Sequence, residues 1–121
     1  MTVYRTPTCG CCKAWVSHLE KAGLTATIIE RDDLAETKRR AGVPEEYEAC
    51  HTGLIEGYFV EGHVPAGDIR RLLAGRPRAR GLVVPGMPVG SPGMEVAGVK
   101  AEPFQTLLIA ADGSASVFAN H

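Results

Sequence analysis

The sequence lacks any excess of basic residues. Its 13 lysine and arginine residues are offset by 14 aspartate and glutamate residues, which leaves a formal net charge of −1. Proteins that bind nucleic acids or anionic membranes by electrostatic attraction usually carry a clear positive surplus. The composition therefore gives no support for a polymeric partner, and we expect no nucleic acid among the ligands.

Long apolar runs and a leader are also missing. No stretch approaches the ~20 apolar residues that a membrane-spanning helix needs. The chain enters strand-like sequence at Thr2, with no basic region or apolar segment before it. We expect a soluble protein without membrane insertion. A secreted protein whose leader has been removed would begin in the same way, so this feature does not assign the protein to the cytoplasm.

The first 75 residues alternate between segments typical of strands and of helices. With 121 residues, the chain is long enough to bury a hydrophobic core without disulfide bonds. We expect strands at 2–6 and 25–32, helices at 11–23 and 33–44, two strands around Glu56-Gly57 within 50–65, and a closing helix at 65–75. The resulting β-α-β-α-β-β-α order resembles the thioredoxin fold, so we predict an α/β domain over residues 1–75.

From Arg76 onward the sequence changes character. Residues 76–96 are rich in proline and glycine, and residues 104–118 are typical of a β-hairpin that turns at Asp112-Gly113. This part of the chain is too short and too rich in loops to bury a core of its own. We therefore expect residues 76–121 to form a loop-rich C-terminal extension, containing a β-hairpin, that packs on the first domain and contributes to its metal site.

Three of the four cysteines lie within four positions, at Cys9, Cys11 and Cys12. Cysteines so close together rarely form more than one unstrained disulfide among themselves, so redox or metal chemistry explains the cluster better. Cys9 and Cys12 form a C-x-x-C pair at a helix N-terminus, where unpaired N–H groups and the helix dipole stabilise thiolates. An exchange pair needs only two sulfurs, whereas Cys11 adds a third ligand for a metal. A buried structural role for these cysteines is the alternative.

Cys50 and His51 form a second signal, at the start of the third predicted strand. In thioredoxin-like folds this position faces the C-x-x-C turn and usually carries a proline, which shields the thiols from metal ions. Here Cys50 would add a fourth sulfur to the same site, with His51 beside it. The alternative is that Cys50 is an ordinary core residue.

Methionine is scarce, and its placement in the extension is unusual. Apart from Met1, the methionines are Met87 and Met94, each in a Pro-Gly-Met unit. Core methionines usually lie on regular helices or strands, whereas Gly/Pro-rich sequence exposes the thioether. We predict that Met87 and Met94 reach the sulfur site as ligands. Alternatively, they anchor the loop on the domain.

Thiolates and thioethers form a soft ligand set, which favours Cu(I) over ions that prefer oxygen. Zinc would also accept the thiolates and His51, but structural zinc sites use spaced ligand pairs, and the adjacent Cys11-Cys12 does not match that spacing. Adjacent thiolates suit bridging positions between metal ions, so a multinuclear copper cluster fits the ligand set. The predicted ligands are Cys9, Cys11, Cys12, Cys50, His51, Met87 and Met94.

Four motifs together carry a more specific resemblance. They are CGCC at 9–12, ACHTG at 49–53, YFVEGHVPAGDI at 58–69 and VPGMPVGSPGME at 84–95. In this combination nearly the whole chain is similar to the CopG-type copper-resistance proteins of Gram-negative bacteria. The resemblance implies copper binding at Cys9, Cys11 and Cys12, a contribution from the extension, a periplasmic location, and an oxidoreductase role that interconverts Cu(I) and Cu(II). The expected partners are copper ions and a periplasmic copper chaperone or efflux system, and we expect a monomer.

Two other functions remain consistent with the sequence. A thiol-disulfide oxidoreductase, or an enzyme resembling arsenate reductase, would use Cys9 and Cys12 as its catalytic pair. A zinc- or disulfide-stapled domain would use the cysteines for structure alone. Neither alternative needs Cys11, Cys50 and the paired Pro-Gly-Met units together, which favours copper.

The remaining histidines carry weaker signals. We interpret His18 as a surface residue or a hydrogen-bonded core residue, because it lies two helical turns from Cys11. His63 precedes Pro65, and we interpret it as a cap for the closing helix, with an approach to the sulfur site as the alternative.

Overall fold

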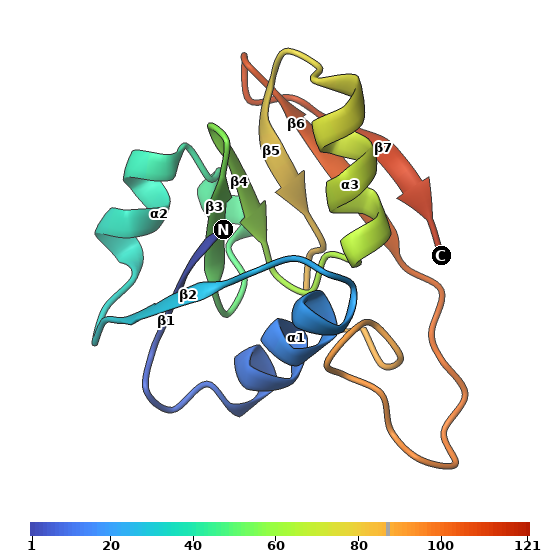
Figure 1. Cartoon of the computed structure of the whole chain (residues 1–121). Helices are drawn as coiled ribbons and strands as arrows, with labels where there is room; N and C mark the ends of the chain where they lie inside the picture. The colour runs from blue at the N-terminus through green and yellow to red at the C-terminus, as the bar shows by residue number, and fades with distance from the viewer. Residues whose placement is uncertain (87) are drawn as a thin grey trace.

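The computed structural model describes residues 1–86 and 88–121, and for Cys11 it describes the backbone alone. Met87, one of the predicted ligands, lies outside the described residues. The elements follow one another along the chain as shown in Figure 1. They are β1 (Thr2–Arg5), α1 (Gly10–Lys21), β2 (Thr27–Glu30), α2 (Ala35–Ala41), the 3-10 helix η1 (Glu45–Tyr47), β3 (Thr52–Ile55), β4 (Tyr58–Glu61), α3 (Ala66–Gly75), β5 (Ala79–Val83), β6 (Gln105–Ala110) and β7 (Ala115–Asn120).

The strands of the described residues hydrogen-bond into one seven-stranded sheet in the order β2-β1-β3-β4-β5-β6-β7. β1 and β2 are parallel and are connected through α1, whereas β3 is antiparallel to both β1 and β4. The hairpin of β3 and β4 turns at Glu56-Gly57, the position that the sequence indicated. The predicted α/β fold with thioredoxin-like strand order is confirmed.

β5 is a strand that the sequence pattern did not predict. It pairs in parallel with β4, and Gly81 lies opposite Phe59. A Cβ atom at Gly81 would come within 2.1 Å of the Phe59 carbonyl oxygen, so only glycine permits this close approach. β6 and β7 form the hairpin expected around Asp112-Gly113 and complete the sheet. The same sheet thus continues from the first part of the chain into residues 76–121.

Two hydrophobic clusters cover the two faces of the sheet. Val60 and Phe59 are adjacent on β4 and belong to different clusters, as the alternation of side chains along a strand requires. α1 and α3 pack on the face that holds Val60 (Figure 1), and the end of α2 packs with Phe59. No helix among the described residues is both long and apolar enough to cross a membrane.

The amphipathic pattern of α1 determines where its cysteines lie. The buried side chains follow one another at intervals of three and one residues, which places them on a single helix face. They are Cys12, Trp15, Val16 and Leu19. Cys12 is therefore held on the inner face of the helix, at its first turn.

Candidate metal centre

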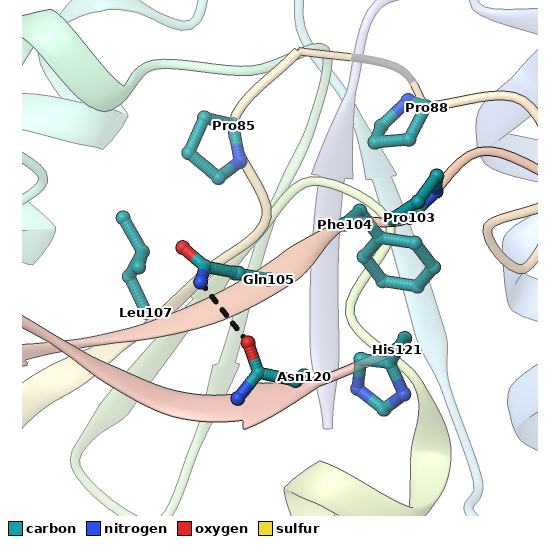
Figure 2. A pocket seen from close by; sticks show the side chains of 8 residues that line it. All are labelled: Pro85, Pro88, Pro103, Phe104, Gln105, Leu107, Asn120 and His121. Carbon is teal, nitrogen blue, oxygen red and sulfur yellow. Dashed lines mark hydrogen bonds between the residues drawn. The ribbon is translucent and has the colours of Figure 1, made fainter.

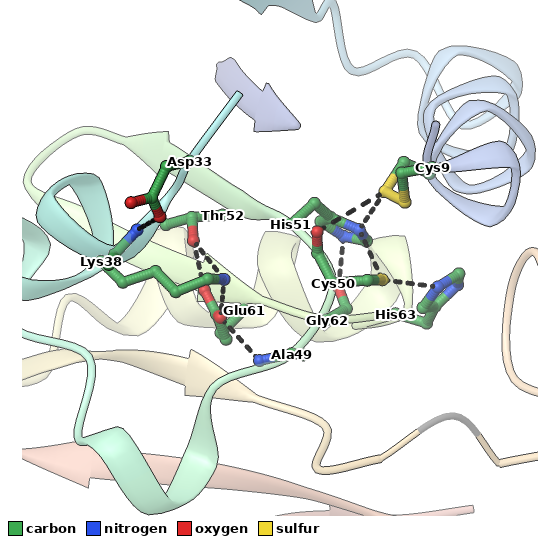
Figure 3. Close-up of polar contacts among 12 residues, drawn as sticks. Cys9, Asp33, Lys38, Ala49, Cys50, His51, Thr52, Glu61, Gly62 and His63 are labelled. Atoms are coloured by element: carbon green, nitrogen blue, oxygen red, sulfur yellow. Dashed lines mark hydrogen bonds and ion pairs between the residues drawn. A yellow bond between two sulfur atoms is a disulfide. The ribbon is translucent and has the colours of Figure 1, made fainter. Parts of the chain in front are cut away.

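The sulfur atoms of Cys9 and Cys12 lie at the start of α1. Cys9 is the N-cap residue of the helix, and Cys12 is fully buried beneath the first turn. The two sulfurs form a disulfide whose Cα atoms are 5.5 Å apart (Figure 3). The C-x-x-C pair is therefore in its oxidised form in this structure. Cys11 lies between them in the helix, and its side chain is outside the described part of the chain.

Cys50 and His51 approach this pair from the loop before β3. The candidate ligand atoms of Cys9, Cys12, Cys50 and His51 all lie within 4.8 Å of one another. The predicted position of Cys50 beside the C-x-x-C turn is therefore confirmed. Because bonds from a metal ion to sulfur and nitrogen are about 2.0–2.3 Å long, a single ion placed among these atoms could contact several of them.

His51 presents a nitrogen lone pair to the sulfurs. Its Nε2 lies 2.8 Å from the carbonyl oxygen of Gly62, and a carbonyl only accepts, so Nε2 carries the proton and donates it. Nδ1 is then unprotonated, and it lies 3.2 Å from Cys12 Sγ and 3.3 Å from Cys50 Sγ. Burial, followed by the nearby His63, lowers the pKa of His51 to about 3. The imidazole is therefore neutral at physiological pH, which is the form that binds metal ions.

Trp15 holds the His51 ring in this orientation. Its indole stacks on the imidazole with the ring centroids 4.2 Å apart. The indole Nε1–H donates a hydrogen bond of 2.8 Å to the carbonyl oxygen of Val64. Because Trp15 is the one tryptophan in the chain, its fluorescence reports directly on changes around His51.

His63 also reaches the site, as the alternative interpretation of this residue allowed. Its Nδ1 donates to the carbonyl oxygen of Pro92 at 2.5 Å, so its Nε2 is unprotonated and lies 3.5 Å from Cys50 Sγ. The ring is fully buried, and burial lowers the pKa of His63. The sequence held a signal for this position: Thr52 of β3 pairs with Glu61 of β4, and the same antiparallel register places Cys50 opposite His63.

The extension covers one side of the site through its second Pro-Gly-Met unit. The connection between β5 and β6 passes beside α1 (Figure 1), where the Pro92 carbonyl accepts the hydrogen bond of His63. Gly93 has a φ of +91°, and a Cβ atom there would lie 2.9 Å from both His63 Nδ1 and the backbone nitrogen of Trp15. Met94 follows and is half-buried. Met94 is thus the next residue after Gly93, which contacts His63 and Trp15. The role of Met94 as a ligand stays a prediction.

The Gly93→Ala variant should test how closely the extension is pressed against the site. Alanine at this φ costs about 1–2 kcal/mol, and forcing a methyl group into a filled space adds about 1–3 kcal/mol. We expect the free energy of unfolding, measured by urea denaturation, to fall by the sum of these two costs. Gly98→Ala is the matched control, because Gly98 also has a positive φ of +77° but has nothing within 4 Å of its Cβ position. Equal losses of unfolding free energy in the two variants would mean that Gly93 is not in tight contact with His63 and Trp15.

The neutral state of His51 predicts how stability depends on pH. Its folded-state pKa of about 3 lies below the ordinary value of 6.5, so the unfolded chain binds the proton first as the pH falls. The free energy of unfolding should therefore decrease below pH 6.5, with His51 contributing about 1.4 kcal/mol for each pH unit down to its folded pKa. In the metal-free His51→Gln variant, urea denaturation at several pH values should give a slope smaller by that amount. The same slope in both proteins would contradict the assignment of a buried neutral imidazole.

A buried ion pair lies behind the loop that carries residues 50–51. Glu61 of β4 is fully buried and pairs with Lys38 of α2. The carboxylate also accepts hydrogen bonds from the Ala49 N–H at 2.8 Å and the Thr52 hydroxyl at 2.6 Å (Figure 3). Burial raises the pKa of Glu61, and the positive charge of Lys38 opposes that shift. Since Ala49 and Thr52 flank residues 50–51, the ion pair holds both ends of the ligand-bearing segment.

His18 lies outside the site and is hydrogen-bonded, as predicted. Its Nε2 accepts the backbone N–H of Ala66 at 3.1 Å, at the first residue of α3. His18 therefore satisfies the N-terminal end of the closing helix, which is the role that the sequence suggested for His63.

An open hollow of about 580 Å³ lies between the start of the extension and the last two strands (Figure 2). Its lining residues are Pro85, Pro88, Pro103, Phe104, Gln105, Leu107, Asn120 and His121. His121 is already engaged, because its Nε2 lies 2.8 Å from a carboxylate oxygen of Asp68 and its ring stacks on Phe104. Within the described part of the chain, the residues that line this hollow include no sulfur ligand. The sulfur and imidazole cluster is therefore the better candidate for metal chemistry.

Comparisons with known proteins show which proteins the chain resembles. Residues 47–94, which include Cys50, His51 and His63, match a family described as "Protein of unknown function, DUF411". A solved structure of copper resistance protein CopG, form 2, is 48% identical to this chain, with a TM-score of 0.93 over 99% of this chain and 95% of that one. Form 1 of the same protein is also 48% identical, with a TM-score of 0.92 over 99% of this chain and 94% of that one. No curated protein sequence matches the chain.

Proposed function

The chain belongs to the CopG family of copper resistance proteins, and on that premise we propose that it binds copper ions at the start of α1. The observation that carries this proposal is the convergence of Cys9, Cys12, Cys50 and His51, whose ligand atoms lie within 4.8 Å of one another. Thiolate sulfur selects Cu(I), and imidazole nitrogen suits copper in either oxidation state. Copper is then the cargo or the substrate of the protein.

The ligand set suits a site with several sulfurs. The proposed ligands in the reduced protein are the thiolates of Cys9, Cys11, Cys12 and Cys50, the Nδ1 of His51, and the thioethers of Met87 and Met94. Cys11 and Cys12 are adjacent in α1, and adjacent thiolates suit bridging between ions. We therefore propose that the reduced protein has room for more than one copper ion in a thiolate-bridged cluster.

The disulfide provides a route to copper redox chemistry. When Cys9 and Cys12 change from two thiols to a disulfide, they release two electrons and two protons, which is enough to reduce two Cu(II) to two Cu(I). In the reverse reaction the disulfide takes up two electrons from two Cu(I) and two protons from the solvent, which yields two thiols and two Cu(II). The closed Cys9–Cys12 disulfide supports this exchange, because the two sulfurs are bonded while α1 begins at Gly10, directly after Cys9.

We also propose that the protein is a periplasmic monomer and that it exchanges copper with a copper chaperone or an efflux system. The membership of the family supports this setting. The disulfide is consistent with it, because disulfides persist mainly in oxidising compartments such as the bacterial periplasm.

Anaerobic titration with Cu(II) tests the proposed redox role. The fully reduced protein should convert Cu(II) to Cu(I), measured with a chelator that absorbs visible light only when it holds Cu(I). The Cys9→Ser/Cys12→Ser double variant should produce two fewer Cu(I) per chain than the parent, because its disulfide cannot form. Identical yields in the two proteins would show that Cys9 and Cys12 are not the electron source.

A thiol-disulfide oxidoreductase is the second candidate, because the structure shows a C-x-x-C disulfide at a helix N-terminus. The Cys11→Ser variant separates the two functions. Copper binding requires the additional thiol, so the variant should lose part of its copper stoichiometry while it still forms the Cys9–Cys12 disulfide. Unchanged copper stoichiometry and spectrum would favour the dithiol enzyme.

A further inference from the structure

Closing the Cys9–Cys12 disulfide removes two thiolates from the cluster but leaves another set of ligand atoms together. Cys50 Sγ lies 3.3 Å from His51 Nδ1 and 3.5 Å from His63 Nε2. The two imidazole rings meet at an angle of 65°, with centroids 5.2 Å apart. One sulfur and two nitrogens therefore converge in the oxidised protein, from the loop before β3 and the loop after β4.

The spacing of these atoms suits a shared metal ion. Bonds of about 2.1 Å to nitrogen and 2.3 Å to sulfur, at angles between tetrahedral and trigonal, separate the donor atoms by roughly 3.6–3.8 Å. The observed separations of 3.3 and 3.5 Å differ from that range by only a few tenths of an ångström. Each of the two nitrogens therefore already lies close to the separation from Cys50 Sγ that a shared ion would require.

The opposite edge of each ring is fixed by a backbone carbonyl. His51 Nε2 donates to Gly62 and His63 Nδ1 donates to Pro92, so each ring has its lone pair directed at Cys50. Hydrogen bonds of this kind are the usual support for metal-binding histidines, because they set the tautomer and the ring orientation. Both rings are fully buried, so neither is free to turn toward solvent. The oxidised structure therefore holds two oriented imidazole ligands before any metal arrives.

We propose that the protein with its Cys9–Cys12 disulfide closed binds one copper ion through Cys50 Sγ, His51 Nδ1 and His63 Nε2. A trigonal set of one thiolate and two imidazoles is the arrangement used by copper sites that transfer single electrons, and it accepts both Cu(I) and Cu(II). The inference rests on the proposed copper-binding function and deepens it. One copper ion stays on the protein after Cys9 and Cys12 have given up their electrons, instead of leaving with the lost thiolates.

The test uses the disulfide-closed protein in a Cys11→Ser background, in which Cys50 is the only one of the four cysteines that remains a thiol. Titration with Cu(I) against a competing chelator should give one copper per chain, and mass spectrometry after thiol alkylation should show that the disulfide stayed closed. Copper X-ray absorption should then resolve one sulfur and two nitrogen neighbours. Cys50, His51 and His63 stay unchanged in this measurement, so the result does not depend on the folding of a variant at any of these three ligands.

His63→Gln in the same background tests the nitrogen that the sequence did not select. Glutamine keeps an N–H donor for the Pro92 carbonyl, and we expect the Cu(I) affinity to fall by more than about 100-fold, because even the outer partners of metal ligands are worth 10- to 100-fold. An unchanged affinity, or a copper environment without nitrogen, would overturn the proposed site.

The fully reduced protein is titrated in parallel to separate this inference from the proposed function. If the reduced protein binds copper and the oxidised protein binds none, the single-ion site is wrong while the proposed function stands. If neither form binds copper, the proposed function itself fails. Copper binding by both forms, with His63→Gln weakening the oxidised form, supports both.

Discussion

The Cys12→Ser variant should bind Cu(I) more than about 100-fold more weakly than the parent when both proteins are fully reduced. Cys12 Sγ is fully buried and lies within 4.8 Å of the other candidate ligand atoms, so its loss removes a central ligand. A serine hydroxyl stays protonated where a cysteine becomes a thiolate. Removing a residue that only hydrogen-bonds to a metal ligand already lowers metal affinity about 10- to 100-fold, so the loss of a direct ligand should lower it further. Competitive Cu(I) titration measures the change.

His18→Gln is the matched control for this variant. His18 is on the same helix and is also a residue type that binds copper, but it is bonded to the N–H of Ala66 outside the cluster. The Cu(I) affinity of the His18→Gln variant should equal that of the parent. Cys12→Ser with unchanged affinity would show that the copper ligands lie elsewhere. Far-ultraviolet circular dichroism should be the same in all three reduced proteins, so that a loss of binding reflects the ligand and not the fold.

The Lys38→Met variant should lose about 3–5 kcal/mol of unfolding free energy, which is a large part of the stability of a small domain. Methionine replaces the volume of the side chain but not its charge. Glu61, which is 0% exposed, would then be buried without its positive partner. The carboxylate would have to take up a proton or admit water, and either change weakens its hold on Ala49 and Thr52. Urea denaturation of the metal-free protein gives the loss directly.

The double variant Lys38→Met/Glu61→Gln is the control. It removes both charges and leaves an amide that can still take part in hydrogen bonds with Ala49 and Thr52. We expect it to recover much of the stability that Lys38→Met loses, because breaking a buried pair costs more than replacing it. If Glu61→Gln lowers the free energy of unfolding by the same amount in the Lys38→Met background as in the parent, the two residues act independently. The ion pair then does not hold the ligand loop.

Much of the fold was predictable because the signals are local. The buried positions of α1 recur at helical spacing, and Glu56-Gly57 marks the turn between two runs of strand-forming residues. β5 was not predictable in the same way. Its buried residues Leu82 and Val83 are surrounded by glycine and proline, and their pairing with β4 depends on a contact with Phe59 that local sequence does not show.

The position of Cys50 beside Cys9 and Cys12 was predictable from the resemblance to the thioredoxin fold. The position of His63 was predictable from the register of the β3–β4 hairpin. Cys50 was expected beside Cys9 and Cys12 because a thioredoxin-like sheet brings those loops together. His63 could have been selected from the turn alone, since a hairpin centred on Glu56-Gly57 places residue 63 opposite residue 50. The tautomers of His51 and His63 depend on the carbonyls that they contact, and only the structure identifies those partners.

The buried pair of Lys38 and Glu61 was not predictable from the sequence. Charged residues usually lie on solvated faces, and a lysine in the polar sequence of α2 carries no sign of burial. The structure brings Lys38 to β4 from a helix on the other side of the loop, where Glu61 accepts hydrogen bonds from Ala49 and Thr52. Such long-range charge pairing depends on tertiary packing.

Metal content is the measurement that tests the copper assignment most directly. The protein should be purified without chelators from cells grown with both copper and zinc, and analysed for each element together with its absorption spectrum. Copper bound in stoichiometric amounts, with sulfur-to-copper charge-transfer absorption that Cys12→Ser weakens, is the expected result. Near-stoichiometric zinc without copper would contradict the account, because the cluster of Cys9, Cys12, Cys50 and His51 would then be a zinc site.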